Sequence, residues 1–132
     1  MQTEKQKTWL VTGASKGLGL AIVKQLLALG QNVAATSRNP EALIATVDGE
    51  GDNLLALYTA LADNASVNQA LAQTVEKYGR IDVVINNAGY GIGGSLEELT
   101  DDEVRQSFDV NVFGTINVIR NVLPYMRAQK GG

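Results

Sequence analysis

The chain has 132 residues and a formal net charge of -3, and it contains neither cysteine nor histidine. This length predicts one domain with a buried core and leaves no room for a second domain. The acidic balance provides no positive field for nucleic acid, so we expect no nucleic-acid partner. Without Cys and His there are no disulfides, thiolate nucleophiles or zinc-finger ligands, and we expect no metal site. Proton chemistry is left to Tyr, Lys, Asp or Glu.

The apolar runs of the chain are all far shorter than the roughly 20 residues of a membrane span. Residues 1–7 are polar and charged, without the apolar segment of a secretory signal. We therefore expect a cytoplasmic protein with no membrane partner.

Short β-rich apolar runs alternate with segments of helical periodicity, which is the pattern of a parallel sheet built from βαβ units. We expect strands at 9–11, 33–36, 54–58 and 81–86, and helices at about 17–29, 40–47, 66–78 and from a capping box at Thr100 and Glu103 to about Arg127. Residues 48–53 should form a polar turn, and Pro124 should bend or loosen the last turn of the long helix.

Right-handed crossovers place the first three strands side by side and return the fourth to the free side of the first. The predicted fold is therefore an α/β, doubly wound parallel sheet of Rossmann type with strand order 3-2-1-4, formed by one domain over residues 1–132. The reversal between strands one and four creates a crevice where ligands bind in such sheets.

A glycine-rich segment, Thr12 to Gly19, lies between the first strand and the first helix. Gly13 allows a tight turn, Gly17 lets the backbone approach a pyrophosphate, and Gly19 lets the helix pack closely on the strand. The segment predicts a dinucleotide phosphate site at a helix N-terminus.

Two further motifs follow: Asn86-Asn87-Ala88-Gly89 after the fourth apolar run, and Asp109-Val110-Asn111-Val112-Phe113-Gly114 in the long helical stretch. With these motifs in this order, the chain resembles the short-chain dehydrogenase/reductase family from about Lys7 to Gly132, which covers the N-terminal half of a typical member. The resemblance implies an oxidoreductase that, in its full-length form, passes a hydride between a nicotinamide coenzyme and a small carbonyl or alcohol substrate. We expect a chain truncated before the fifth strand.

Ser37 and Arg38 follow the second strand, where an enzyme that uses NAD usually presents a carboxylate to the ribose. Lys16 adds a second cation, and NADP-preferring members of the family typically carry both basic positions. We therefore predict NADP(H) as the coenzyme. The alternative is that Lys16 and Arg38 are ordinary solvated charges.

The resemblance also implies roles for Asp63, which would accept a hydrogen bond from the adenine amino group, and for Asn87 to Gly89, which would line the ribose. Asp63 can also be a helix N-cap, and both of its roles can hold together, whereas the alternative for the Asn87 segment is a plain turn. The predicted coenzyme-binding residues are Gly13, Ser15, Lys16, Gly17, Leu18, Gly19, Arg38, Asp63, Asn87, Ala88 and Gly89.

Of the family's catalytic residues, only Asn111 has a counterpart, and its alternative role is to brace the long helix. The serine and the Tyr-x-x-x-Lys pair are absent, because the residues four positions after the four tyrosines are Ala62, Asp82, Gly94 and Gln129. Tyrosine alone, with a pKa near 10, is a poor base at neutral pH. The 132-residue chain by itself is expected not to turn over substrate.

An apolar strand edge at Val83-Val84-Ile85 and a helix that is apolar on more than one face predict self-association or pairing with a missing C-terminal half. The alternative function is a non-catalytic nucleotide-binding or interaction module that uses these surfaces for a partner. A flavin or mononucleotide carrier is disfavoured by Arg38 and the Asn87 motif.

Overall fold

The computed structural model describes residues 5–47 and 51–132. The predicted turn at 48–53 falls partly on residues 48–50, which lie outside the described residues, as do residues 1–4 of the polar N-terminus.

Four parallel strands form one sheet in the order β3-β2-β1-β4, which confirms the predicted topology. The strands are β1 (Thr8–Val11), β2 (Asn32–Ser37), β3 (Leu54–Tyr58) and β4 (Val83–Ile85). The helices are α1 (Gly17–Ala28), α2 (Pro40–Thr46), α3 (Asn64–Tyr78), α4 (Asp101–Phe108) and α5 (Thr115–Gln129), with a π-helical segment η1 (Asp109–Gly114) between the last two.

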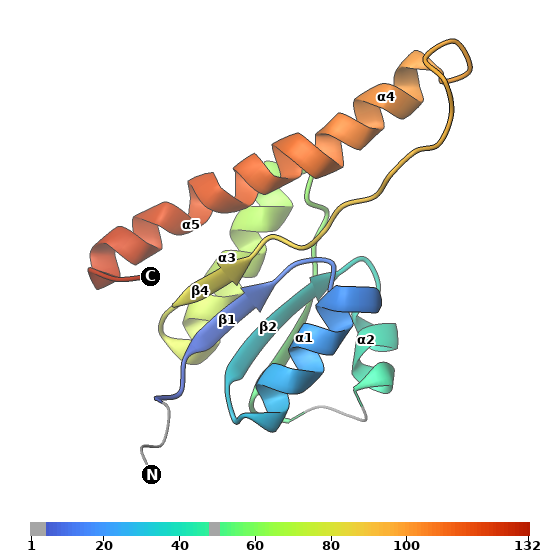
Figure 1. Cartoon of the computed structure of the whole chain (residues 1–132). Helices are drawn as coiled ribbons and strands as arrows, with labels where there is room; N and C mark the ends of the chain where they lie inside the picture. The colour runs from blue at the N-terminus through green and yellow to red at the C-terminus, as the bar shows by residue number, and fades with distance from the viewer. Residues whose placement is uncertain (1–4, 48–50) are drawn as a thin grey trace.

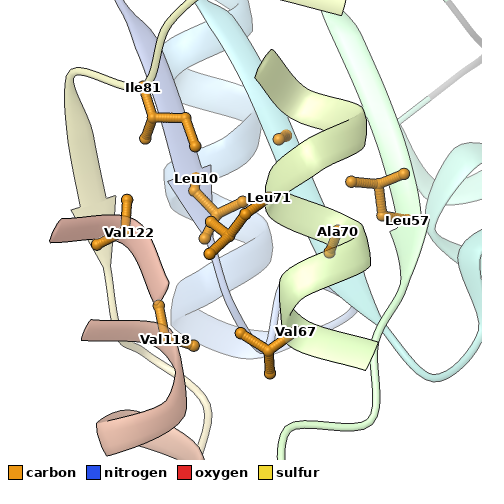
Figure 2. Close-up of a cluster of buried hydrophobic side chains, with 9 residues drawn as sticks. Leu10, Leu57, Val67, Ala70, Leu71, Ile81, Val118 and Val122 are labelled. Carbon is orange, nitrogen blue, oxygen red and sulfur yellow. The ribbon is translucent and has the colours of Figure 1, made fainter. Parts of the chain in front are cut away.

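The helices cover both faces of the sheet, with α1 and α2 on one face and α3 and α5 on the other (Figure 1). Successive residues of β2 point to opposite faces, so that Ala34 packs toward α3 and α5 while Val33 and Ala35 pack toward α1 and α2. Figure 2 shows the core between the sheet and the α3–α5 pair, which consists of Leu10, Ala34, Leu57, Val67, Ala70, Leu71, Ile81, Val118 and Val122. Two cores thus hold the strand ends at a fixed separation.

The helix ends follow from local chemistry. Asn39 caps α2 by accepting a hydrogen bond from the Ala42 N–H at 3.1 Å, with Pro40 in the first turn as predicted. Asp63 caps α3, which begins at Asn64 and therefore two residues earlier than predicted. Thr100 and Glu103 form the predicted capping box at the start of α4. The Glu103 carboxylate accepts hydrogen bonds from the backbone N–H and from the hydroxyl of Thr100. These bonds hold the pKa of Glu103 below its ordinary value, and the backbone bond has the larger effect.

The strand β4 is shorter than the predicted 81–86 because both ends of that run are engaged elsewhere. The backbone N–H and C=O of Ile81 pair with the side-chain amide of Gln129 on α5, at 3.0 and 2.9 Å, and not with β1. At the other end the chain turns at once, since the Asn87 N–H returns to the Ile85 carbonyl at 3.0 Å. The C-terminal end of α5 is thereby fastened to the start of β4.

The sequence predicted one continuous C-terminal α-helix, but the structure divides this stretch into α4, η1 and α5. It widens into the π-helical η1 over Asp109–Gly114 before continuing as α5, which runs through Pro124 to Gln129. A π turn inserts one residue without changing the apolar pattern on either side, so periodicity alone does not reveal it. In the described residues, no helix combines the length and apolar character needed to cross a membrane.

Candidate functional site

A cavity of about 500 Å³ opens at the carboxyl ends of the strands, beside the switch between β1 and β4. Five segments contribute to its wall: the loop from β1 to α1, the end of β2, the residues after β3, the residues after β4, and η1. The lining residues are Gly13, Ser15, Lys16, Gly17, Thr36, Ser37, Arg38, Thr59, Leu61, Asn87, Ala88, Gly89, Tyr90 and Val110. The predicted crevice is therefore present, because parallel strands end together at one edge of the sheet.

The three glycines of the first loop have three different surroundings. Gly13 has a φ of 62°, and a Cβ on it would lie 2.8 Å from the Ala88 Cα. A Cβ on Gly19 would collide with the Gly13 carbonyl oxygen and lie 2.5 Å from Asn87 Nδ2. Gly17 has a φ of 59°, and a Cβ there would meet nothing within 4 Å. Gly13 and Gly19 thus permit close packing, whereas Gly17 leaves open space over the start of α1.

The start of α1 has the character of an anion site. Lys16 occupies the N-cap position without a side-chain hydrogen bond, and the first turn of α1 carries no acidic residue. The free N–H groups and the positive end of the helix dipole therefore stay available to an anion in the cavity.

The charged side chains of the cavity wall are both cations. Lys16 and Arg38 are exposed, and neither forms a salt bridge within residues 5–47 and 51–132. The described cavity lining contains no aspartate or glutamate. This wall favours a ligand with more than one phosphate group.

Thr12 and Asn87 lock the loops after β1 and β4 together. The Thr12 hydroxyl accepts hydrogen bonds from the N–H groups of Asn87 and Ala88, at 3.1 and 3.0 Å. The Asn87 Nδ2 donates in return to the carbonyls of Thr12 and Gly13, both at 3.1 Å. Thr12 is 1% exposed and was not predicted as a site residue, although its place between the first strand and Gly13 could have drawn attention to it.

Asn111 binds the backbone of the loop after β4. Its Oδ1 accepts from the Tyr90 N–H at 2.9 Å, and its Nδ2 donates to the Tyr90 carbonyl at 2.7 Å and to the Ser107 Oγ at 3.1 Å. Asn111 does not line the cavity, but its neighbour Val110 does. In this structure Asn111 therefore holds the Tyr90 backbone against the long helix, and a catalytic role remains a prediction.

The structure brings most of the predicted coenzyme residues to one place. Gly13, Ser15, Lys16, Gly17, Arg38, Asn87, Ala88 and Gly89 line the cavity. Gly19 lies beneath it, packed against Gly13, while Leu18 is 70% exposed on α1. The Asp63 carboxylate accepts from the Ala65 N–H at 3.0 Å as the α3 cap and is not among the lining residues. Its predicted adenine contact stays a prediction.

Several lining residues were not predicted, namely Thr36, Ser37, Thr59, Leu61, Tyr90 and Val110. The first four lie at or just after the ends of β2 and β3, so the predicted strand ends could have suggested them. No sequence feature indicated Val110 as a lining residue, because it lies within the long helical stretch and reaches the cavity only through the path of that helix.

Tyr78 is unsuited to act as a base. Its hydroxyl donates to the Asp52 carbonyl at 3.0 Å, and burial, with a smaller contribution from the charge of Asp52, raises its pKa to about 12. A tyrosine with such a pKa stays protonated at neutral pH. Of the four tyrosines, only Tyr90 is among the described residues that line the cavity.

A parallel sheet in the order 3-2-1-4, with a glycine loop at its switch point, defines a Rossmann-type nucleotide-binding domain. A family model described as short chain dehydrogenase matches residues 7–132, so the chain belongs to the short-chain dehydrogenase/reductase family.

Two curated relatives illustrate this membership. The chain is 42% identical over 127 residues to Oxidoreductase BOA17 of Botryotinia fuckeliana, covering 96% of this chain and 46% of that protein. It is also 42% identical over 123 residues to a 3-ketodihydrosphingosine reductase of Bacteroides thetaiotaomicron, covering 93% and 43%. The chain thus spans about half the length of these relatives.

Solved structures share the fold. A short-chain dehydrogenase from Streptomyces avermitilis superposes with a TM-score of 0.90 at 39% identity, covering 99% of this chain and 48% of that one. A short chain dehydrogenase/reductase from Burkholderia phymatum in complex with NAD has a TM-score of 0.90 at 27% identity, covering 100% and 48%. A blue fluorescent protein from a metagenomic library in complex with NADPH has a TM-score of 0.81 at 32% identity, covering 93% and 52%.

Proposed function

We propose that this chain binds NADP(H) in preference to NAD(H). The observation that carries the proposal is the pair of cations in the cavity wall, Lys16 and Arg38, with no acid at the end of β2. A carboxylate there would repel a ribose 2′-phosphate, whereas a guanidinium can bind it with two hydrogen bonds. The family membership supports a nicotinamide coenzyme, and solved relatives hold either NAD or NADPH.

The residues of the cavity fit such a coenzyme in two ways. The open space above Gly17 and the uncapped start of α1 would take the pyrophosphate, while Ser15 lies in the same wall. The segment Asn87 to Gly89, fixed by Thr12, would take the ribose on the β4 side. Leu18, Gly19 and Asp63 remain proposed coenzyme-binding residues, with the Asp63 carboxylate as an acceptor for the adenine amino group.

We propose that the full-length protein is an oxidoreductase for a small carbonyl or alcohol substrate, and that it is cytoplasmic. A nicotinamide coenzyme supplies or accepts the hydride when bound. The residues of this chain bind the coenzyme, orient it and hold the Tyr90 loop through Asn111. The serine and Tyr-x-x-x-Lys that move the substrate proton in the family have no counterpart here, so we expect binding without turnover from the 132-residue chain.

The test is a titration of the purified chain with NADPH and NADH, following nicotinamide fluorescence. We expect NADPH to bind at least tenfold more tightly, because one charge-assisted hydrogen bond to a phosphate contributes about 1.5–3 kcal/mol. Equal affinities would refute the 2′-phosphate pocket, and binding of neither nucleotide would favour the alternative interaction module. NADPH oxidation with a panel of ketones and aldehydes should stay at background, and robust turnover would contradict the expected inactivity.

The alternative or additional role as an interaction module rests on the outer face of the long helix. While Val118 and Val122 are buried in the core, a second row of large apolar side chains on the same helix is exposed. Its members are Phe108, Val112, Phe113, Ile116, Ile119 and Leu123. We propose that this row pairs with a second copy of the chain, or with a C-terminal half such as the longer relatives possess.

Ile119→Glu should shift the chain toward the monomer in sedimentation velocity, because it places a charge in the middle of the exposed row. Leu29→Glu is the matched control, since Leu29 is also exposed but directly follows α1, a helix that covers the other face of the sheet (Figure 1). We expect the control to sediment like the original chain. A monomeric original chain at all concentrations would contradict self-association.

A further inference from the structure

The Asn111 amide uses both of its hydrogens within the protein, and one of them goes to a residue of the same long helix. Its Nδ2 donates to the Tyr90 carbonyl at 2.7 Å and to the Ser107 Oγ at 3.1 Å, while its Oδ1 accepts from the Tyr90 N–H at 2.9 Å. An asparagine amide has two hydrogens to donate, so Ser107 takes the one that Tyr90 leaves over. The Ser107 hydroxyl thereby completes the bonds of this side chain.

Ser107 lies on α4, one helical turn before Asn111, and is half-buried. Side chains four residues apart meet on one face of a helix, which places the hydroxyl beside the amide. The π-helical η1 begins between them, at Asp109. The bond from Asn111 to Ser107 therefore spans the junction where the α-helical pattern of backbone bonds changes to the π pattern.

A second hydroxyl holds the main chain of Asn111. The Thr115 Oγ1, at the start of α5, donates to the Asn111 carbonyl at 3.3 Å. Gly89 leaves room for the Asn111 side chain, since a Cβ on Gly89 would lie 3.0 Å from the Asn111 Oδ1. Asn111 is thus fixed at its main chain by Thr115 and at its amide by Ser107 and Tyr90.

Tyr90 is the part of the cavity wall that depends on this arrangement. It lines the cavity beside Val110, yet the loop from Tyr90 to Thr100 is exposed except for the half-buried Leu99. Packing in the core therefore does not fix the start of this loop. The N–H and the carbonyl of Tyr90 both bond to the Asn111 amide, so that amide sets where Tyr90 lies.

The strand order decides which part of a dinucleotide meets Tyr90. In doubly wound sheets the pyrophosphate lies at the start of the first helix, and the adenosine ribose lies at the end of the second strand. Because β4 borders β1 on the side away from β2, the half of the dinucleotide beyond the pyrophosphate meets the loop after β4. A displaced Tyr90 should disturb this half and leave the adenosine half alone.

We propose that Ser107 is a positioning residue for the nicotinamide end of the cavity: its hydroxyl holds the Asn111 amide against the Tyr90 backbone and so keeps Tyr90 in the wall. This inference rests on the proposed function. Ser107 is not among the lining residues and acts through Asn111. Without the hydroxyl, one amide hydrogen of Asn111 loses its partner, and the amide gains by turning toward water and away from Tyr90.

The test is Ser107→Ala, followed by hydrogen exchange and by coenzyme titration. Alanine is the stronger helix former, so the substitution by itself should not destabilise α4. The Tyr90 N–H should exchange about three- to tenfold faster, as expected for the loss of one neutral hydrogen bond. The affinity for NADPH should fall about two- to fivefold. The affinity for 2′,5′-ADP, which lacks the nicotinamide half, should stay the same.

Ser107→Thr is the matched control, because it keeps the hydroxyl and should restore both the Tyr90 exchange rate and the NADPH affinity. The Ala88 N–H, which the Thr12 hydroxyl binds at 3.0 Å, should exchange equally in all three proteins.

Unchanged Tyr90 exchange in the alanine variant would overturn the inference, and so would equal losses of affinity for NADPH and 2′,5′-ADP. A threonine variant that behaves like the alanine variant would show that the hydroxyl is not the group that matters, which also overturns it. If the original chain binds neither nucleotide, the proposed function itself fails, and Tyr90 exchange alone decides whether Ser107 holds the loop.

Discussion

Gly19→Ala is expected to unfold the chain at a much lower urea concentration, whereas Gly17→Ala should leave it folded but weaken coenzyme binding. The two glycines lie in the same loop, yet their surroundings differ. A methyl group on Gly19 would collide with the backbone carbonyl of Gly13 and press on the Asn87 side-chain amide, which two hydrogen bonds hold in place. Overpacking of this kind, together with a disturbed Asn87 hydrogen bond, should cost about 3 kcal/mol.

A methyl group on Gly17 meets no protein atom within 4 Å, so its cost to the free chain is the positive φ of 59° alone. That strain is about 1–2 kcal/mol for an L-residue. The methyl would, however, stand in the open space above the start of α1 where the pyrophosphate is proposed to lie. We expect NADPH to bind more than tenfold more weakly, which corresponds to at least 1.4 kcal/mol.

Urea denaturation and NADPH titration of both variants separate these two effects. Gly91→Ala is the control, because Gly91 has open space around it and lies outside the cavity lining. A Gly19→Ala chain as stable as the original would show that the loop can relax, and the packing argument would be wrong. A Gly17→Ala chain with unchanged NADPH affinity would place the pyrophosphate elsewhere.

Arg38→Asp is expected to reverse the coenzyme preference. The substitution removes a guanidinium that can hold the 2′-phosphate and puts a carboxylate at the end of β2, where NAD-binding domains hold the ribose 2′-hydroxyl. We expect NADPH to bind about 100-fold more weakly, since the loss of a charge-assisted contact combines with repulsion from the new carboxylate. NADH should bind as before or more tightly.

Arg120→Asp is the control, because it makes the same change in net charge on α5, outside the cavity lining. It should leave the affinities for NADPH and NADH unchanged. If Arg38→Asp lowered the affinities for NADPH and NADH equally, the 2′-phosphate assignment would be refuted.

The preference of the original chain for NADPH should also shrink as the salt concentration rises, because Lys16 and Arg38 are exposed and ions screen exposed charges.

The fold was predictable because its signals are local and repeated. Apolar runs, helix caps at Asn39 and Thr100, and the glycine spacing after β1 each specify a short segment, and the right-handed crossover rule then permits one strand order. The same logic located the crevice, since the predicted residues at the ends of β1, β2 and β4 had to meet at one edge of the sheet.

The details that the sequence left open lie where one segment contacts another. The Asp63 carboxylate accepts the hydrogen bond of the α3 cap, which was one of the two roles expected for it. Asn111 was placed correctly on the long helix, but its bonds to the Tyr90 backbone depend on where the loop after β4 returns. The π turn that carries Asn111 changes neither composition nor apolar spacing, so nothing in the sequence indicated it.

The sequence by itself determined the order of the elements, the glycine loop and the two cations of the cavity wall, because each depends on residues that are neighbours along the chain. Only the tertiary structure decided how those parts are joined. The bonds of Thr12 to Asn87 and of Asn117 to Leu61 link residues 75 and 56 positions apart. Such long-range hydrogen bonds depend on angles and distances that the packed helices and sheet impose, and no short stretch of sequence encodes them.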